Sequence, residues 1–182
     1  MAAITAAEIQ VRGSVVAGAA GNATAFGGVD TSLGKYIASG NLPDATINSL
    51  LSDATGAENA GSVVHYQCVF VYNSNALNAY QNAVVWVSGD PAGGGAVAIA
   101  VDSVAASAVG SAAAQALQIA NRTTAPAALA FSTPTTAGAG LALGSIPAGN
   151  VKAVWIRRTL SNTAALNADG ITISIQGDTA AA

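Results

Sequence analysis

Residues 62–73 of the chain, SVVHYQCVFVYN, decide the fold. Valine and aromatic residues dominate this run, and they alternate with the period of two that characterises a β-strand. The two predicted faces carry Tyr66, Cys68, Phe70 and Tyr72 on one side and His65, Gln67, Val69 and Val71 on the other. The pattern predicts a long strand near 63–73.

Similar runs follow at intervals, separated by turns rich in Gly, Pro and Asn. They predict further strands near 82–88, 96–101, 151–160 and 171–176. Short strands with such turns and scarcely any helix indicate an all-β chain. We therefore predict a single antiparallel β-sandwich, jelly-roll-like, over residues 41–182.

Other parts of the chain show weaker patterns. Residues 1–40 are rich in Gly and Ala, and we expect them to form an extended N-terminal arm or a loosely ordered lead-in, which becomes ordered against a neighbour. PDATINSLLSDATGAE (43–58) favours one short helix, capped by Asp44 or Thr46, with Ile47, Leu50 and Leu51 facing inward. SAAAQALQIA (111–120) is a second possible short helix.

The chain is unusually poor in charge. Its 182 residues include 6 Lys and Arg and 9 Asp and Glu, so that 8% are charged and the net charge is -3. Ordinary soluble domains contain about 25% charged residues. Six cations cannot form the basic surface that nucleic-acid binding needs. A surface with so few charges is expected to be covered by a partner.

Membrane, export and disorder signals are also weak. Residues 123–151 are uncharged, but their prolines and many polar residues do not suit an apolar spanning helix. The N-terminus has no basic segment followed by an apolar run, so we expect no signal peptide. A composition that is 52% hydrophobic, with a mean hydropathy of +0.47, argues against disorder.

Catalytic groups are scarce, and the sequence predicts a protein that is not an enzyme. His65 and Cys68 are the only histidine and the only cysteine, and a spacing of three places them on opposite faces of a strand. Asp44, Asp53 and Glu58 lack the spacing of a calcium loop, so helix capping and turn formation are the favoured interpretation, with a calcium site as the alternative. We predict no cofactor and no metal.

Two tryptophans and two arginines are the candidate contact residues. Trp86 and Trp155 lie in apolar strands and suit either the core or an interface, with ligand stacking as a less favoured role. Arg157 and Arg158 are adjacent, so one faces each side of the sheet. One reading is a solvated residue and an internal ion pair; the other places one of them at a protein–protein contact. We predict all four as interface residues.

Several segments together resemble small virion structural proteins of tailed bacteriophages. The likeness spans about residues 47–178 and is strongest in the last forty. It rests on these segments: SLLSDATGAENAG, VVHYQCVFVYN, NAVVWVSG, TTAPAALAFSTP and LGSIPAGNVKAVWIRRTLSNTAALNADGITISIQGDT. Members of that group resemble decoration or cement proteins, which coat a capsid shell and brace it.

The resemblance implies a non-enzymatic decoration protein on the capsid exterior, made in the host cytoplasm. Its partners would be the major capsid protein lattice and further copies of itself, as a dimer or trimer, with neither nucleic acid nor membrane involved. The alternative is a receptor- or carbohydrate-binding module of a tail fibre or baseplate, with Tyr66, Tyr72, Tyr80 or Trp86 as stacking platforms. A cellular surface or fimbrial subunit is a third class, against which the missing export signal argues.

Overall fold

The computed structural model describes residues 3–17, 24–90, 94–164 and 170–179. Strand β4 (Val64–Asn73) pairs along its whole length with β9 (Asn150–Thr159), and these two long strands form the centre of the larger sheet. The order in this sheet is β1 (Ile9–Arg12), β4, β9 and β6 (Ala96–Val101), and β7 (Ser107–Ala108) also pairs with β9. All of its pairings are antiparallel.

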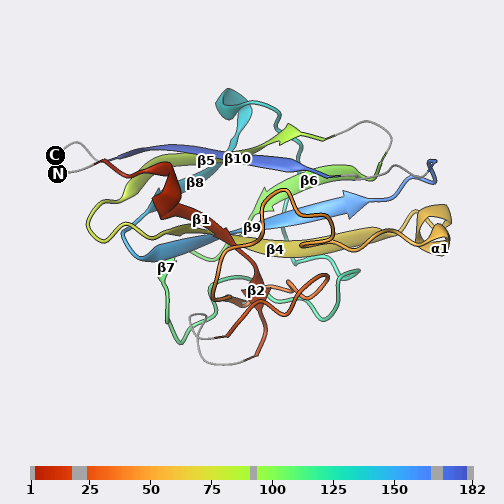
Figure 1. Ribbon diagram of the computed structural model, residues 1–182, viewed down its shortest axis with the longest axis horizontal. Helices are drawn as coiled ribbons and strands as arrows, with labels where there is room; N and C mark the ends of the chain where they lie inside the picture. The colour runs from red at the N-terminus through yellow and green to blue at the C-terminus, as the bar shows by residue number, and fades with distance from the viewer. Residues whose placement is uncertain (1–2, 18–23, 91–93, 165–169, 180–182) are drawn as a thin grey trace.

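A smaller antiparallel sheet packs over one face of the first (Figure 1). Its order is β10 (Thr172–Thr179), β5 (Tyr80–Gly89) and β8 (Leu141–Ile146). The five strands that the sequence predicts correspond to β4, β5, β6, β9 and β10. The prediction of an all-β antiparallel sandwich is therefore confirmed.

The space between the two sheets holds the first of two apolar cores. Val69 and Val71 of β4 point into it and meet Val85 and Val87 of β5, with Val154 of β9 beside them. These side chains occupy alternate positions of their strands, as the period of two predicts. Each of the five is at most 3% exposed.

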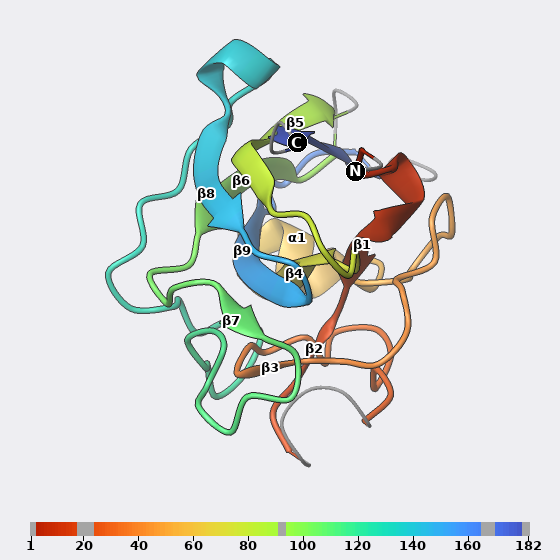
Figure 2. The ribbon, with the colours of Figure 1, turned by 90° about the vertical axis from the view of Figure 1, so that its left-hand side faces the viewer.

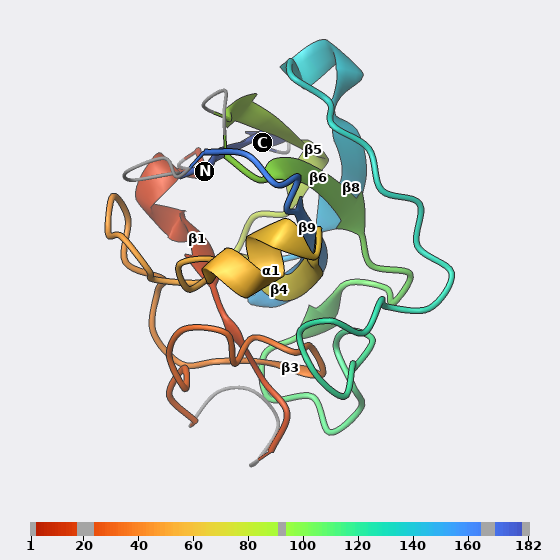
Figure 3. The same ribbon diagram turned by 90° about the vertical axis from the view of Figure 1, so that its right-hand side faces the viewer.

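The second core lies on the opposite face of the larger sheet. Cys68, Phe70 and Trp155 point into it and are fully buried, together with Ile37. Irregular chain covers this face, including β2 (Ser14–Val15), β3 (Tyr36–Ile37) and the loops after β7 (Figures 2 and 3). The molecule thus has three layers, and β4 and β9 are buried on both sides.

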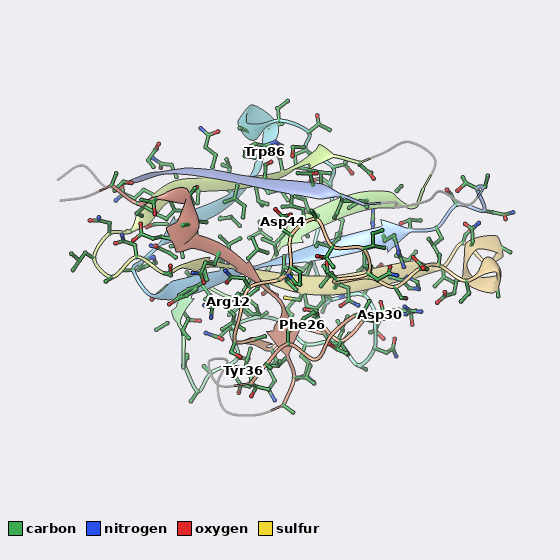
Figure 4. The ribbon with its side chains drawn as sticks, in the orientation of Figure 1. Arg12, Phe26, Asp30, Tyr36, Asp44 and Trp86 are labelled. Carbon is green, nitrogen blue, oxygen red and sulfur yellow. The ribbon has the colours of Figure 1, made fainter. Side chains whose placement is uncertain are left out.

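Residues 1–40 differ from the arm that the composition suggests. Residues 9–15 run in an extended conformation, but β1 pairs with β4, and Ser14, Ser32 and Ile37 are fully buried. Figure 4 shows Phe26 and Tyr36 within the layer beneath the larger sheet. The described part of this region is therefore packed into the fold, and the expectation that it extends away from the sandwich is wrong there.

The expected helices need correction as well. Residues 43–54 form turns and bends, and Ile47 is 67% exposed instead of facing inward. Helix α1 (Gly56–Ala60) begins later, because Thr55 and Glu58 form a reciprocal capping box. Residues 111–120 contain no helix; Gln115 instead bonds the main chain of Ile37 and Ala108. The remaining helical turns are η1 (Ala6–Glu8) and η2 (Ala137–Ala139).

Candidate functional site

The segment from Ser103 to Pro147 contributes no exposed charge to the protein surface, and we call its exposed residues the neutral face. All of these residues are described, and their exposed members are Ala, Gly, Ser, Thr, Asn, Gln and Pro. Arg122 is the single charged residue of the segment, and it is half-buried. Figures 2 and 3 show the segment along one side of the molecule, from β7 past η2 to β8.

Exposed charge lies elsewhere and is of one sign. Among the described residues, the exposed charged side chains are Asp44, Asp53, Asp90 and Asp178. All six Lys and Arg residues are described, and each is half-buried or buried. The surface therefore combines a neutral side with a few scattered carboxylates.

The cations are half-buried because the fold uses them in internal contacts. Arg12 lies over the ring of Tyr72, with 4.6 Å from its guanidinium carbon to the ring centre. Lys35 lies 5.2 Å from the ring centre of Tyr36. Such contacts between a cation and an aromatic face keep the charged group attached to the protein surface. These two cations are thus already paired within the chain.

Trp155, a predicted interface residue, lies entirely in the second core. Its exposed fraction is 0%, and its indole Nε1 donates a 2.7 Å hydrogen bond to Oδ2 of Asp102. A side chain enclosed in this way cannot contact a second molecule. The structure assigns Trp155 to the core, and the prediction that it is an interface residue is wrong.

Asp102 is a buried carboxylate that the protein supplies with several donors. Besides the indole of Trp155, Oδ2 accepts from the amide of Leu117 and Oδ1 from the amide of Val104, both at 2.8 Å. Lys152 donates to the main-chain oxygens of Asp102 and Val104 at 2.7 and 2.5 Å. Burial lowers the pKa of Lys152, and the charge of Asp102 opposes that shift. These bonds hold the end of β6 and the following loop against β9.

Arg157 and Arg158 face opposite sides of the sheet, as their adjacent positions predict. The guanidinium carbon of Arg157 lies 5.2 Å from the ring centre of Phe131, on the side of the second core. Arg158 donates from Nη1 to the main-chain oxygen of Ser52 and from Nη2 to Nδ1 of His65, both at 2.9 Å. Both arginines are half-buried in contacts within the chain, so the prediction of a polar anchor to another molecule has no support from their geometry.

Trp86 differs from the other three predicted interface residues. It alternates along β5 with the core residues Val85 and Val87, so it lies on the outer face of the smaller sheet, where it is half-buried (Figure 4). Close by, the hydroxyls of Ser88 and Ser174 are 2.7 Å apart. Trp86 is therefore available for contact with another molecule.

The three tyrosines considered as stacking platforms are occupied or buried. Tyr80 is 8% exposed and belongs to the core between the sheets. Tyr66 packs edge-to-face on Phe131, with 5.6 Å between ring centres, and Tyr72 lies under Arg12. Of the four aromatic residues proposed for stacking, Trp86 is the one that lies on the outer face of a sheet.

A group of polar residues at one end of β4 and β9 was not anticipated. Its members, which we call the His65 cluster, are Asp30, Ser52, Glu58, His65, Arg122 and Arg158. His65 is 0% exposed. Its Nδ1 accepts from Arg158, and its Nε2 lies 3.3 Å from Oε1 of Glu58. Because arginine can only donate, Nδ1 carries no proton, and the neutral ring is protonated at Nε2.

Arg122, which belongs to the segment from Ser103 to Pro147, is the remaining member of the His65 cluster. Its Nη2 bonds Oε1 of Glu58, and its Nη1 bonds Oδ2 of Asp30 and, at 2.7 Å, the hydroxyl of Ser52. Ser52 therefore contacts both arginines, through its hydroxyl and its main-chain oxygen. Residues from four parts of the chain, near 30, between 52 and 65, near 122 and near 158, thus meet in one set of polar contacts.

The ionisation of the cluster follows from this arrangement. Burial lowers the pKa of His65, and the positive charges of Arg122 and Arg158 lower it further against the opposing carboxylates. Hydrogen bonds from the main chain and hydroxyl of Thr55 lower the pKa of Glu58, with help from Arg122. Desolvation acts to raise the pKa of Asp30, but bonds from Ser52 and Arg122 outweigh it. The cluster thus contains two carboxylates, two guanidiniums and a neutral imidazole.

One part of the cluster can be recognised from a local sequence motif. Thr55 and Glu58 follow the T-x-x-E pattern of a capping box, which marks the true start of the helix. Asp30 and Arg122 are 92 residues apart, and no local pattern links them. His65 and Cys68 do face opposite sides, and burial raises the pKa of the Cys68 thiol well above its usual value.

The described residues offer few other sites. A pocket of about 270 Å³ opens between η1 and the ends of β5 and β10, lined mainly by Ile4, Ile9, Tyr80 and Ile175. Within the described part of the chain, no three His, Cys, Asp or Glu side chains are placed to hold a metal ion. There is also no described helix long and apolar enough to cross a membrane.

The neutral face, with the adjoining outer face around Trp86, is the candidate functional surface, and the His65 cluster is the candidate ionisable site. The chain matches no protein-family model, and comparisons with curated proteins and with solved structures find no match.

Proposed function

We propose that this chain is a non-enzymatic structural protein of a bacteriophage virion, which binds the outside of the capsid shell and stabilises it as an oligomeric decoration protein. The observation that carries the proposal is the neutral face. A surface without exposed charge is poorly suited to permanent contact with water. It is well suited to close contact with another protein, because charged residues are depleted at the centre of interfaces.

The resemblance of residues 47–178 to phage virion proteins supplies the choice of partner. A sandwich with two buried cores can hold such a surface in a fixed shape, because the covering loops are bonded to the sheet at several points. Ser132, for example, exchanges two main-chain hydrogen bonds with Ile99 of β6, at 2.8 and 3.0 Å. Preorganised loops lose little conformational entropy on binding.

The alternative function, a carbohydrate- or receptor-binding module of the tail, is favoured by one observation. Trp86 presents an aromatic ring on a sheet face that also carries the hydroxyls of Ser88 and Ser174. Aromatic rings beside hydrogen-bonding groups suit sugar recognition. This function requires that Trp86 be free in the assembled particle.

The test is to add the purified protein to shells of its phage that lack it, and to measure sedimentation and thermal breakage of the shells. We expect saturable binding in many copies per shell and a higher breakage temperature for coated shells, because a ligand of the assembled state stabilises that state. Cryo-microscopy of the particle should then show the protein over the head. A protein that is monomeric in ultracentrifugation, has no affinity for shells and lies at the tail would overturn the proposal.

The two functions also separate through Trp86. Trp86→Ala should leave shell binding at its normal level if docking uses the neutral face alone, and it should abolish glycan-array binding if the tail function holds. Loss of glycan binding together with tail location would establish the alternative.

A further inference from the structure

We propose that the His65 cluster is an acid-sensitive latch that fastens helix α1 and the loop before it to the end of the sandwich. Protonation of His65 opens the latch locally while the two sheets remain folded. This inference is independent of the capsid proposal, since it concerns a device within one chain.

The cluster is the place where several loops are tied to the strands. Glu58 comes from α1, Ser52 and Asp30 from the loops before it, and Arg122 from the segment between Ser103 and Pro147. His65 and Arg158 lie opposite each other near the ends of β4 and β9. Leu42 and Leu50, on either side of the exposed turn at 43–48, pack against the first core. Release of the latch would therefore uncover one end of that core.

The imidazole is the part of the latch that responds to mild acid. Nδ1 must be unprotonated to accept from Nη2 of Arg158, so a proton added there removes the 2.9 Å bond. It also places a cation directly against the Arg158 guanidinium, inside a site where His65 is fully buried. Two cations in contact at such a partly buried site repel each other, because solvent screens them only in part.

The charged groups around His65 determine how readily the imidazole ring is protonated. Arg158 on β9 and Arg122 on the loop at 121–124 disfavour the protonated ring, whereas Glu58 on α1 and Asp30 on the loop at 28–31 favour it. Asp90 also lies nearby, since it accepts from the amide of Val97, the partner of Arg158 on β6. Glu58 and Asp30 are already bound to Arg122. Their negative charges are thus shared with Arg122 and compensate a third cation only in part, and opening toward water relieves the remaining repulsion.

The first measurement is a titration of the imidazole by nuclear magnetic resonance in the full chain. His65 is the sole histidine, so its ring signals need no assignment. We expect the ring to be the Nε2–H tautomer at pH 7.5 and to titrate with a midpoint below 6.5. A midpoint at or above 6.5, or an Nδ1–H tautomer, would overturn the proposal.

The second measurement is amide hydrogen exchange between pH 7.5 and 5, corrected for the intrinsic pH dependence of exchange. Protection of peptides covering 49–62 should fall by about tenfold for each pH unit below about 6.5. The reason is that His65 binds a proton more readily in the opened state than in the closed state, so acid favours opening. Amides of β5 and β10 should remain better protected than those of 49–62 at every pH of this range, because their exchange requires a larger opening than the latch. Exchange of these strands at the same free energy as 49–62 would show that only global unfolding exposes the segment, and it would contradict a local latch.

The matched variant is His65→Gln, which is uncharged at every pH. In this variant, the protection of amides in 49–62 should not fall between pH 7.5 and 5 once the intrinsic pH dependence is removed. This expectation holds even if the protection at pH 7.5 differs from that of the natural chain. Equal acid dependence in the variant and the natural chain would refute the role of His65. If the variant does not fold, the titration and the exchange of the natural chain still decide the question.

Discussion

The indole Nε1 of Trp155 and the carboxylate Oδ2 of Asp102 form a 2.7 Å hydrogen bond inside the second core. This bond links the largest buried side chain of β9 to the residue that directly follows β6. The same carboxylate accepts from two main-chain amides of the loop that follows, at Val104 and Leu117. Asp102 therefore joins the sheet to the beginning of the neutral face.

Replacement of Asp102 by Ala should destabilise the protein strongly. The change leaves the Trp155 indole and the amides of Val104 and Leu117 without their acceptor, and each buried unsatisfied donor costs about 1–3 kcal/mol. We expect the free energy of unfolding in urea to fall by about 3 kcal/mol or more.

The matched control is Asp44→Ala. Asp44 is exposed, and its side chain accepts from the amide of the adjacent Ala45. Its loss should cost roughly 0.5 kcal/mol, as is usual for surface changes. Equal effects of the two substitutions would contradict the role assigned to the buried carboxylate.

Gly34 should tolerate no side chain. Its φ is 88°, and an added Cβ would lie 1.9 Å from the main-chain oxygen of Leu117 and 2.9 Å from Cζ2 of Trp155. Gly40 has a similar φ of 80° but open space around the Cβ position. Gly40→Ala should cost about 1–2 kcal/mol from the backbone conformation alone. Gly34→Ala should cost several kcal/mol more, or prevent folding, because the main chain itself must move.

Urea unfolding of the two glycine variants separates backbone strain from the steric clash. The difference between them is the quantity of interest, since the conformational penalty is common to both. Similar stabilities would show that the main chain at Leu117 can move away from residue 34 at little cost, and the close approach of the two would then contribute little to the stability of the fold.

The stability of the protein should depend on pH in two stages. His65 has a lowered pKa in the folded chain, so its contribution to stability is complete above its ordinary value of 6.5 and is lost as the pH falls toward the folded value. Glu58 and Asp30 also have lowered pKa values, so further stability is lost below 4.5 and 3.8. Urea midpoints should be flat above pH 7 and decline in both acid ranges.

Variants assign the two stages to their groups. His65→Gln should remove the decline that begins near pH 6.5, and Glu58→Gln should weaken the decline below 4.5. A natural chain whose stability stays constant from pH 7.5 to 5 would contradict the lowered pKa of His65.

The sequence predicts the strands well and the loops poorly, for a physical reason. In β4, alternation of Val69 and Val71 with Cys68 and Phe70 is a local pattern, and each set reaches a different core. The packing of residues 1–40 depends instead on partners far along the chain, such as Ser32, whose main chain bonds that of Cys68. Gly- and Ala-rich sequence carries no periodicity that reveals such contacts.

The candidate site, too, can be predicted from the sequence only in part. Trp86 and Trp155 have similar apolar surroundings in sequence, yet one lies on an outer face and the other is fully buried. The difference arises from Ile37, Ile119 and the other loop residues that cover the second core. Composition, by contrast, predicts that some part of the surface is covered, because the whole chain is poor in charge, but it does not say which part. In the sequence, the uncharged run from 123 to 151 is considered only as a membrane span, and it overlaps the neutral face in the structure.

The neutral face should lose its binding partner when a charge is placed on it. Thr135 and Ala142 are exposed in this face, and Ala57 and Ala60 are exposed on α1. We expect Thr135→Lys, Thr135→Asp and Ala142→Lys each to weaken binding to bare shells by about ten- to a hundredfold, because an unpaired charge in an interface costs about 1–3 kcal/mol. Ala57→Lys and Ala60→Lys should bind normally, and all five variants should keep the stability of the natural chain.

The use of both signs at Thr135 makes this comparison decisive. If the partner surface is neutral and close-packed, lysine and aspartate must both weaken binding, because each is buried without a counter-charge. If one sign weakens binding and the other strengthens it, the partner is charged, and electrostatic attraction has replaced close contact as the explanation. If neither sign changes binding while the α1 variants abolish it, the docking surface lies at the other end of the molecule. Sedimentation of each variant with shells, at low and at physiological salt, separates the three outcomes, since only a charged interface weakens as salt rises.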